Sequence, residues 1–133
     1  MTSLRAAAVG LVVDPDWGDR IREMAARMPA WVIDTPANRC AVSELRASRA
    51  AGSDNLTTFQ SAAESPEDAC VGILHVIDLH HGKQSQGVPY SAVEVIGARP
   101  TIAVLQACGE LELTAITPHE NGFTASRVGP QPK

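Results

Sequence analysis

Short apolar runs alternate with amphipathic segments along the chain, and this alternation limits the possible folds more than any other feature of the sequence. The run Ala6–Val13 is continuous and apolar, which is typical of a strand that is covered on both faces. The segment that follows repeats large apolar residues at helical spacing from Trp17 to Met28. Repetition of this unit predicts right-handed crossovers and a mostly parallel sheet between two layers of helices.

The same reasoning applied to the whole chain gives six strands and four helices. The expected strands are Ala6–Val13, Trp31–Ile33, Leu56–Gln60, Tyr90–Ile96, Leu111–Ile116 and Phe123–Val128. The expected helices run from Trp17 to Met28, from Pro36 to about Ala50, from Pro66 to Gly82 and from Pro100 to Gly109. In the last helix, Ile102, Leu105 and Cys108 are expected to face inward.

The end of the chain carries a hairpin signal, Glu120-Asn121-Gly122, because Asn-Gly accepts positive φ at little cost. We therefore expect a three-layer α/β/α sandwich with a mostly parallel sheet and an antiparallel C-terminal hairpin. A ferredoxin-like α+β fold is the alternative, since the C-terminal half alone has the order β-α-β-β. Residues 1–128 are expected to form one α/β domain, and residues 129–133 a flexible tail.

Composition excludes some classes of partner. The 133 residues carry a formal net charge of −4, and the basic residues form no stripe, so a nucleic-acid partner is not expected. No stretch approaches the length of a membrane span, so no membrane association is expected either. The cysteines Cys40, Cys70 and Cys108 are far apart, which argues against a disulfide framework and for a cytoplasmic location. All three cysteines are expected to face the core. Separately, the chain uses Arg far more often than Lys, which is typical of proteins from GC-rich bacterial genomes.

Polar residues follow the first two strands, where an open α/β sheet binds its ligands. The residues in question are Asp14, Asp16, Asp34, Thr35, Asn38 and Arg39. If the two strands are neighbours, the aspartates of both loops meet at one edge, where they could hold Mg²⁺ or share a proton. Arg39 could bind a small anion beside the positive end of its helix. Helix capping and turn formation are the more common reasons for such residues at these places.

Histidines offer a second, weaker candidate for metal binding. His80 and His81 follow one another, so on a helix they point about 100° apart and do not easily share one metal ion. Their helix is also expected to end at the amino edge of the sheet, away from the acidic loops. No phosphate-binding loop, dinucleotide fingerprint or nucleophile elbow occurs.

The sequence thus favours a small interaction or regulatory domain without catalysis and without a resident cofactor. Phe123 and Val128, on the last strand, are the expected contact residues for a protein partner or for self-association. Two alternatives stay open. One is a metal-assisted hydrolase or phosphoryl-transfer enzyme that uses Mg²⁺ at the acidic strand ends, and the other is a binder of a small anion.

Overall fold

Six strands and four α-helices alternate along the part of the chain that the computed structural model describes, which is residues 8–48, 56–85 and 91–127, with the main chain alone over 77–85. The strands are β1 (Ala8–Val12), β2 (Ala30–Ile33), β3 (Leu56–Phe59), β4 (Ala92–Ile96), β5 (Ala115–His119) and β6 (Gly122–Ser126). The helices are α1 (Ile21–Arg27), α2 (Pro36–Ser48), α3 (Pro66–Ser85) and α4 (Ile102–Glu110), and a 3-10 turn, η1 (Gly18–Arg20), precedes α1.

All six strands belong to one sheet in the order β3-β2-β1-β4-β6-β5. β1 is parallel to both of its neighbours, with Leu11 opposite Trp31 in β2 and Val95 in β4. β6 runs antiparallel to β4 and to β5, and the hairpin turns at Glu120 and Asn121. The predicted α/β architecture is confirmed, including the parallel pairing of the first two strands and the antiparallel hairpin.

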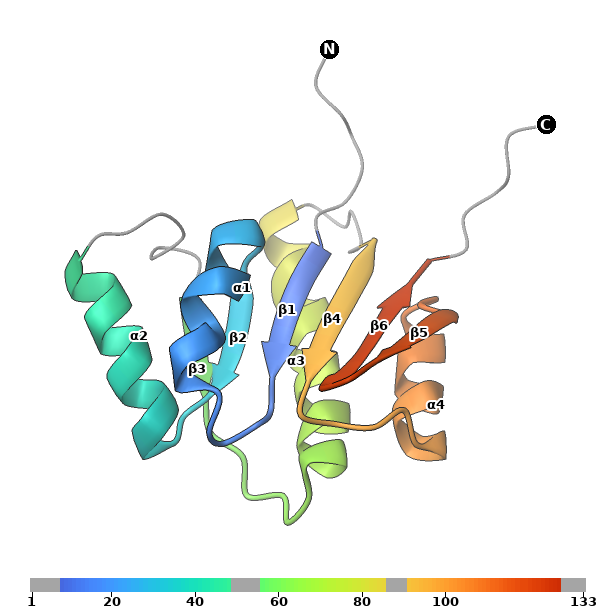
Figure 1. The fold of residues 1–133 in the computed structure, drawn as a ribbon. Coiled ribbons are helices and arrows are strands. Elements are labelled where there is room, and N and C mark those ends of the chain that lie inside the picture. Colours follow the sequence, from blue (N-terminus) through green and yellow to red (C-terminus); the bar gives the residue numbers. More distant parts are fainter. Residues whose placement is uncertain (1–7, 49–55, 86–90, 128–133) are drawn as a thin grey trace.

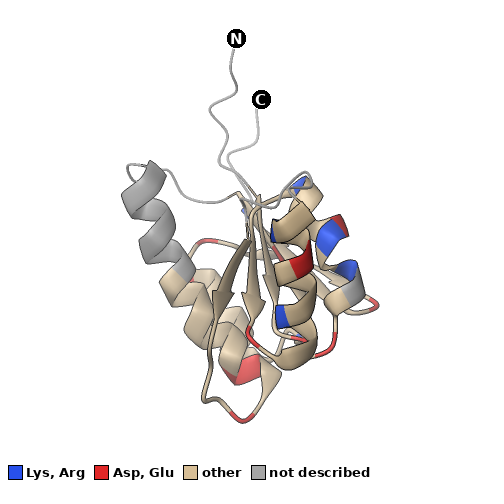
Figure 2. Cartoon of the chain, turned by 90° about the vertical axis from the view of Figure 1, so that its left-hand side faces the viewer, with Lys and Arg blue, Asp and Glu red and all other residues tan. Residues whose placement is uncertain are grey.

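The helices lie on both faces of the sheet, and each face has its own apolar core. α1 and α2 cover one face around Ile21, Met24 and Leu45. α3 and α4 cover the other face around Leu74, Val104 and other buried residues. Figure 2 shows the two helical layers with the sheet between them, and acidic residues along the lower rim, where the parallel strands end.

The half of the sheet formed by β4, β6 and β5 is covered by described helices on one face only (Figure 1). Its other face carries small and polar side chains, such as the row Thr117, Thr124 and Glu94 across the three strands. Arg27 of α1 reaches this face and donates two hydrogen bonds of 3.1 Å to the Glu94 carboxylate, which holds the pKa of the guanidinium above its usual value. A sheet face of this composition can remain in water.

Four predicted details are wrong. The first helix, expected from Trp17, begins at Ile21 after the 3-10 turn η1. The third helix passes Gly82 and ends at Ser85. In α4 the inward residues are Val104, Ala107 and Cys108, whereas Ile102 is 76% exposed and Leu105 is 39% exposed. The predicted strand Leu111–Ile116 begins only at Ala115.

The late start of β5 has a local cause at the end of α4. The Leu113 N–H donates to the Cys108 carbonyl at 2.8 Å, so the chain closes a turn around the last helical carbonyls. Glu112 adopts a φ of 64° in this turn, and Leu113 is buried directly after it. Residues 111–114, which the alternating pattern assigned to a strand, therefore form the end of α4 and the turn after it.

No helix in the described part of the chain is long and apolar enough to cross a membrane. The expected tail, residues 129–133, lies outside the described residues.

Candidate functional site

The residues predicted after β1 and β2 do meet at the carboxyl edge of the sheet, and the buried amide of Asn38 joins them. Its Nδ2 donates to the carbonyl oxygens of Asp14 (2.8 Å) and Ile33 (3.3 Å). Its Oδ1 accepts the N–H of Trp17 at 3.1 Å. Asn38 therefore ties the loop after β1 and the end of β2 to the first turn of α2, and both its oxygen and its nitrogen are occupied.

Thr35 caps α2, as predicted, and also holds the neighbouring loop. Its Oγ1 accepts the N–H of Asn38 at 3.4 Å and donates to the Pro15 carbonyl at 2.7 Å. Asp14 forms a local turn, in which its Oδ1 accepts the N–H of Asp16 at 3.0 Å. These contacts are of the kind that capping and turn chemistry predict.

Asp34, just before α2, forms an ion pair with Arg39 near the start of that helix, with 2.8 Å between Asp34 Oδ1 and Arg39 Nε. The hydrogen bond from Arg39 lowers the pKa of Asp34, and the same bond raises the pKa of Arg39. The side chain of Arg39 is 60% exposed, so solvent screens this pair. A guanidinium that already binds a carboxylate, on a rim where acids outnumber bases (Figure 2), is a poor receptor for a second anion.

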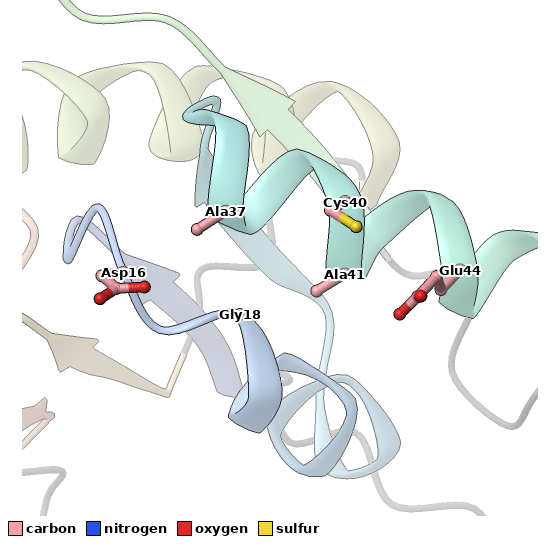
Figure 3. A pocket seen from close by; sticks show the side chains of 6 residues that line it. All are labelled: Asp16, Gly18, Ala37, Cys40, Ala41 and Glu44. Atoms are coloured by element: carbon pink, nitrogen blue, oxygen red, sulfur yellow. The ribbon is translucent and has the colours of Figure 1, made fainter.

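A groove of about 550 Å³ lies beside this network, between α2 and the segment from Asp16 to Gly18 (Figure 3). Asp16, Cys40 and Glu44 contribute its polar atoms, and Ala37, Ala41 and Gly18 contribute its small surface. The expectation that Cys40 faces the core is wrong, because this thiol is exposed. Among the residues that the structure describes, no three His, Cys, Asp or Glu side chains are grouped closely enough to hold a metal ion.

β1 and β4 are neighbours whose chains leave toward opposite faces of the sheet, which is where α/β sheets usually leave a ligand crevice. In this protein the main chain at Asp14 and Gly97 occupies the space where such a crevice would lie. Gly97, with φ of +97°, lies so close to Asp14 that a Cβ on it would stand 2.5 Å from the Asp14 nitrogen. A second hollow of about 370 Å³ lies farther along the rim, beside the β5–β6 turn, and His119 and Arg99 help to line it. His119 Nε2 bonds the Thr124 hydroxyl at 2.6 Å across the hairpin.

Of the other cysteines and histidines considered in the sequence, Cys70 and Cys108 are buried, and the side chains of His80 and His81 are not described. Burial raises the pKa of the Cys70 thiol to about 12 and that of the Cys108 thiol to about 11, so both are protonated at neutral pH. The side chains of His80 and His81 lie outside the described residues, although the main chain of α3 does run from the carboxyl edge to the amino edge, as predicted (Figure 1).

The prediction that Phe123 lies on an exposed edge strand and contacts a partner is wrong. Phe123 is 0% exposed, because β6 lies between β4 and β5 and directs this side chain into the core beneath α4. The free edge belongs to β5, whose exposed or half-buried residues include Ile116 and Pro118. Val128 lies outside the described residues.

The sequence interpretation missed a surface at this end of the molecule. α4 has no charged side chain before its last residue, Glu110, although one side of it faces solvent. Ile102 and Leu105 stand one turn apart on that side, and α4 lies behind β5 and β6 (Figure 1). We call Ile102 and Leu105, together with the free edge of β5 at Ile116 and Pro118, the α4–β5 surface.

A signal for this surface is present in the sequence. A surface helix normally has a charged or polar side opposite its apolar stripe, whereas a helix that is apolar on all sides is normally buried on all sides. Residues 102–109 contain only one strongly polar side chain, Gln106. Comparison of the chain with models of protein families, with curated proteins and with solved structures gives no match.

Proposed function

We propose that this protein is a non-catalytic interaction domain that binds another protein through the α4–β5 surface. The observation that carries the proposal is the 76% exposure of Ile102, with Leu105 beside it, on a helix whose outer side is uncharged. Full burial of a large aliphatic side chain contributes about 1.5–3 kcal/mol, and covering the exposed part of Ile102 and the smaller exposed part of Leu105 would gain a share of that, which favours association.

The contacts at the carboxyl rim support the same proposal. Asn38 and Thr35 have their polar atoms bonded to main-chain groups of neighbouring loops, and Asp34 has Arg39 as its partner. These residues act as ties between segments, which is the role of a scaffold. The surface with unused binding capacity is instead at the other end of the sheet, on α4 and β5.

The chemistry of the α4–β5 surface describes the partner that it fits. The side of α4 that carries Ile102 and Leu105 offers aliphatic side chains and no charge before Glu110, so its partner should present an apolar, uncharged face. β5 offers main-chain groups at the edge of the described sheet and has no Asp, Glu, Lys or Arg over Ala115–His119. The partner should therefore contribute a strand edge next to its apolar face.

Site-specific photocrosslinking tests the proposal. A benzoylphenylalanine at position 105, in cells that make the protein naturally, should give one discrete adduct with another polypeptide. The matched control is the same probe at Val76, which is 47% exposed on α3 and lines a hollow beside Phe59 and Ala62, away from α4. Ile102→Asp should abolish the adduct at position 105. Equal labelling at both positions, or no adduct at position 105, would contradict the proposed function.

A further inference from the structure

We propose that the partner at the α4–β5 surface is a second copy of this chain, joined by antiparallel pairing of the two β5 strands about a two-fold axis at Ile116. This inference rests on the proposed function and names the occupant of the same surface. It follows from three features: the main-chain groups that β5 leaves free, the position of α4 beside that edge, and the lack of Asp, Glu, Lys and Arg over residues 102–109 of α4 and residues 115–119 of β5.

Hydrogen bonds of β6 show which groups of β5 are free. The Gly97 N–H donates to the Asn121 carbonyl at 2.7 Å, and the Arg127 N–H donates to the Ser91 carbonyl at 3.0 Å. In β6 the main-chain N–H and C=O groups of the odd-numbered residues therefore bond to β4. The main-chain groups of the even-numbered residues Gly122, Thr124 and Ser126 point toward β5. Their partners on β5 are His119, Thr117 and Ala115, so Ile116 and Pro118 present their main-chain groups at the free edge.

A two-fold axis through the edge at Ile116 uses these free groups in pairs. Ile116 of each copy would donate its N–H to the Ile116 carbonyl of the other copy. Thr114 would likewise donate to the Pro118 carbonyl of the other copy, at both ends of the contact. Pro118 has no N–H, so it costs the pairing one donor on each side but leaves its carbonyl available.

The same axis brings the two α4 helices together. α4 lies behind β6 and β5 (Figure 1), and if it is centred over the gap between them, the strand spacing of about 4.8 Å puts its axis about 5 Å from the two-fold axis. The two helices would then be about 10 Å apart, which is close to the packing distance of about 8–10 Å between helix axes. Ile116 points toward the α4 side of the sheet, where it packs against the core, so both Ile116 side chains would lie beneath the helix pair.

Charge and area favour a copy over an unrelated partner. Over the paired residues 114–118 neither strand edge carries Asp, Glu, Lys or Arg, so a second copy brings no like charges together there, and Glu112 of each copy lies opposite Glu120 of the other only outside the pairing. A stable interface covers about 800 Å² on each partner, or about a tenth of the 7957 Å² surface of this chain. The two-fold arrangement buries the outer side of α4 and the edge of β5 at the same time, which brings the contact closer to that size.

Measurement of mass in solution tests the pairing. Sedimentation or light scattering should give the wild-type protein twice the mass of one chain. Leu105→Asp should raise the dissociation constant at least about tenfold, because the two-fold axis places both new carboxylates in one apolar contact. Val76→Asp, the same change at a site of similar exposure on α3, should leave the mass unchanged. Circular dichroism should show both variants folded.

A disulfide test checks the register. In an antiparallel hydrogen-bonded pair the two Cα atoms are about 5.5 Å apart, which lies in the range of a disulfide. In a Cys40→Ser background, Ile116→Cys should therefore form a covalent dimer under mild oxidation. His119→Cys, on the same strand but about 20 Å from its own copy at about 3.4 Å per residue, should not.

The outcomes separate this inference from the proposed function. A wild-type protein of single-chain mass at high concentration, or equal crosslinking through positions 116 and 119, would overturn the two-fold pairing. If the adduct from position 105 then contains a different polypeptide, the interaction domain stands and only the second copy is rejected. If the protein is a single chain and position 105 gives no adduct, both proposals fail.

Discussion

A single amide side chain, that of Asn38, bonds three main-chain groups from segments far apart in the sequence. A carboxamide suits this place because it offers a donor and an acceptor on one planar group. The sequence placed Asn38 and Thr35 correctly near the carboxyl edge, since a helix cap must follow β2. Their role could not be read from the sequence, because it depends on which carbonyls the loop after β1 directs toward α2.

Replacement of Asn38 by Ala should lower the free energy of unfolding by about 3 kcal/mol. The change leaves the Trp17 N–H and the Asp14 carbonyl without their partner in a site that is 0% exposed. Denaturation with urea, followed by circular dichroism, measures the loss.

Asn38→Asp provides the control for that prediction. A carboxylate at this place faces two carbonyl oxygens, and burial disfavours its charge, so its pKa should be higher in the folded protein than in the unfolded chain. A group with a raised pKa contributes most to stability below its unfolded pKa and loses that contribution as the pH rises. Asn38→Asp should therefore approach wild-type stability as the pH falls toward about 4, and a deficit independent of pH would contradict this account.

The three cysteines should differ sharply in reactivity. Only the thiolate is nucleophilic, and burial raises the pKa of Cys70 to about 12 and of Cys108 to about 11, whereas Cys40 is exposed. Iodoacetamide at about pH 8 should label Cys40 at least about a hundredfold faster than the other two. Mass spectrometry of peptides before and after unfolding measures the ratio, and rapid labelling of Cys70 in the folded protein would contradict its burial.

At the scale of whole elements, the starts of helices were more predictable than their sides. Pro36, Pro66 and Thr101 mark the starts of α2, α3 and α4, since capping chemistry is local in sequence. The side of α4 that faces the core was not predictable, because residues 102–108 are apolar in every direction and offer no contrast. The prediction chose Ile102, Leu105 and Cys108, and of these only Cys108 is buried beneath α4, together with Val104 and Ala107.

The connection between β4 and α4 should tolerate no side chain at Gly97. An alanine there would have a φ of +97° and a Cβ 2.5 Å from the Asp14 main chain, so Gly97→Ala should cost about 3 kcal/mol of unfolding free energy. Gly72→Ala is the matched control. Gly72 lies in α3 with open space around it, and this change should stabilise the protein by up to about 1 kcal/mol. Denaturant titration of both variants compares them, and a Gly97→Ala protein as stable as wild type would refute the close packing.

For the whole molecule, the order of the elements was sufficient to predict the layers. Alternating strands and helices with right-handed crossovers place β1 beside β2 and require helices on both faces. The exact order of the strands was not predictable, because the position of β6 between β4 and β5 depends on pairing between distant segments. That pairing moved Phe123 from an expected edge into the core and gave the edge to β5.

Thermal unfolding should depend on protein concentration if two copies associate as proposed. Association stabilises the folded state by mass action, so the Tm of the wild-type protein should rise with concentration. Scanning calorimetry over a hundredfold range of concentration measures this, with Leu105→Asp as a variant whose Tm should depend less on concentration. A wild-type Tm that is independent of concentration would count against association.

The two edge strands of the sheet differ in direction. β3 is parallel to its neighbour β2, whereas β5 is antiparallel to its neighbour β6. A two-fold contact between β5 strands would use the β5 edge of each molecule. The two β3 edges would then lie on the outside of the pair, where they cannot reach the main-chain groups of β5 that are already bonded. If two copies pair through β5 as proposed, the two-fold contact uses the β5 edge of both chains, so that edge cannot add a third copy.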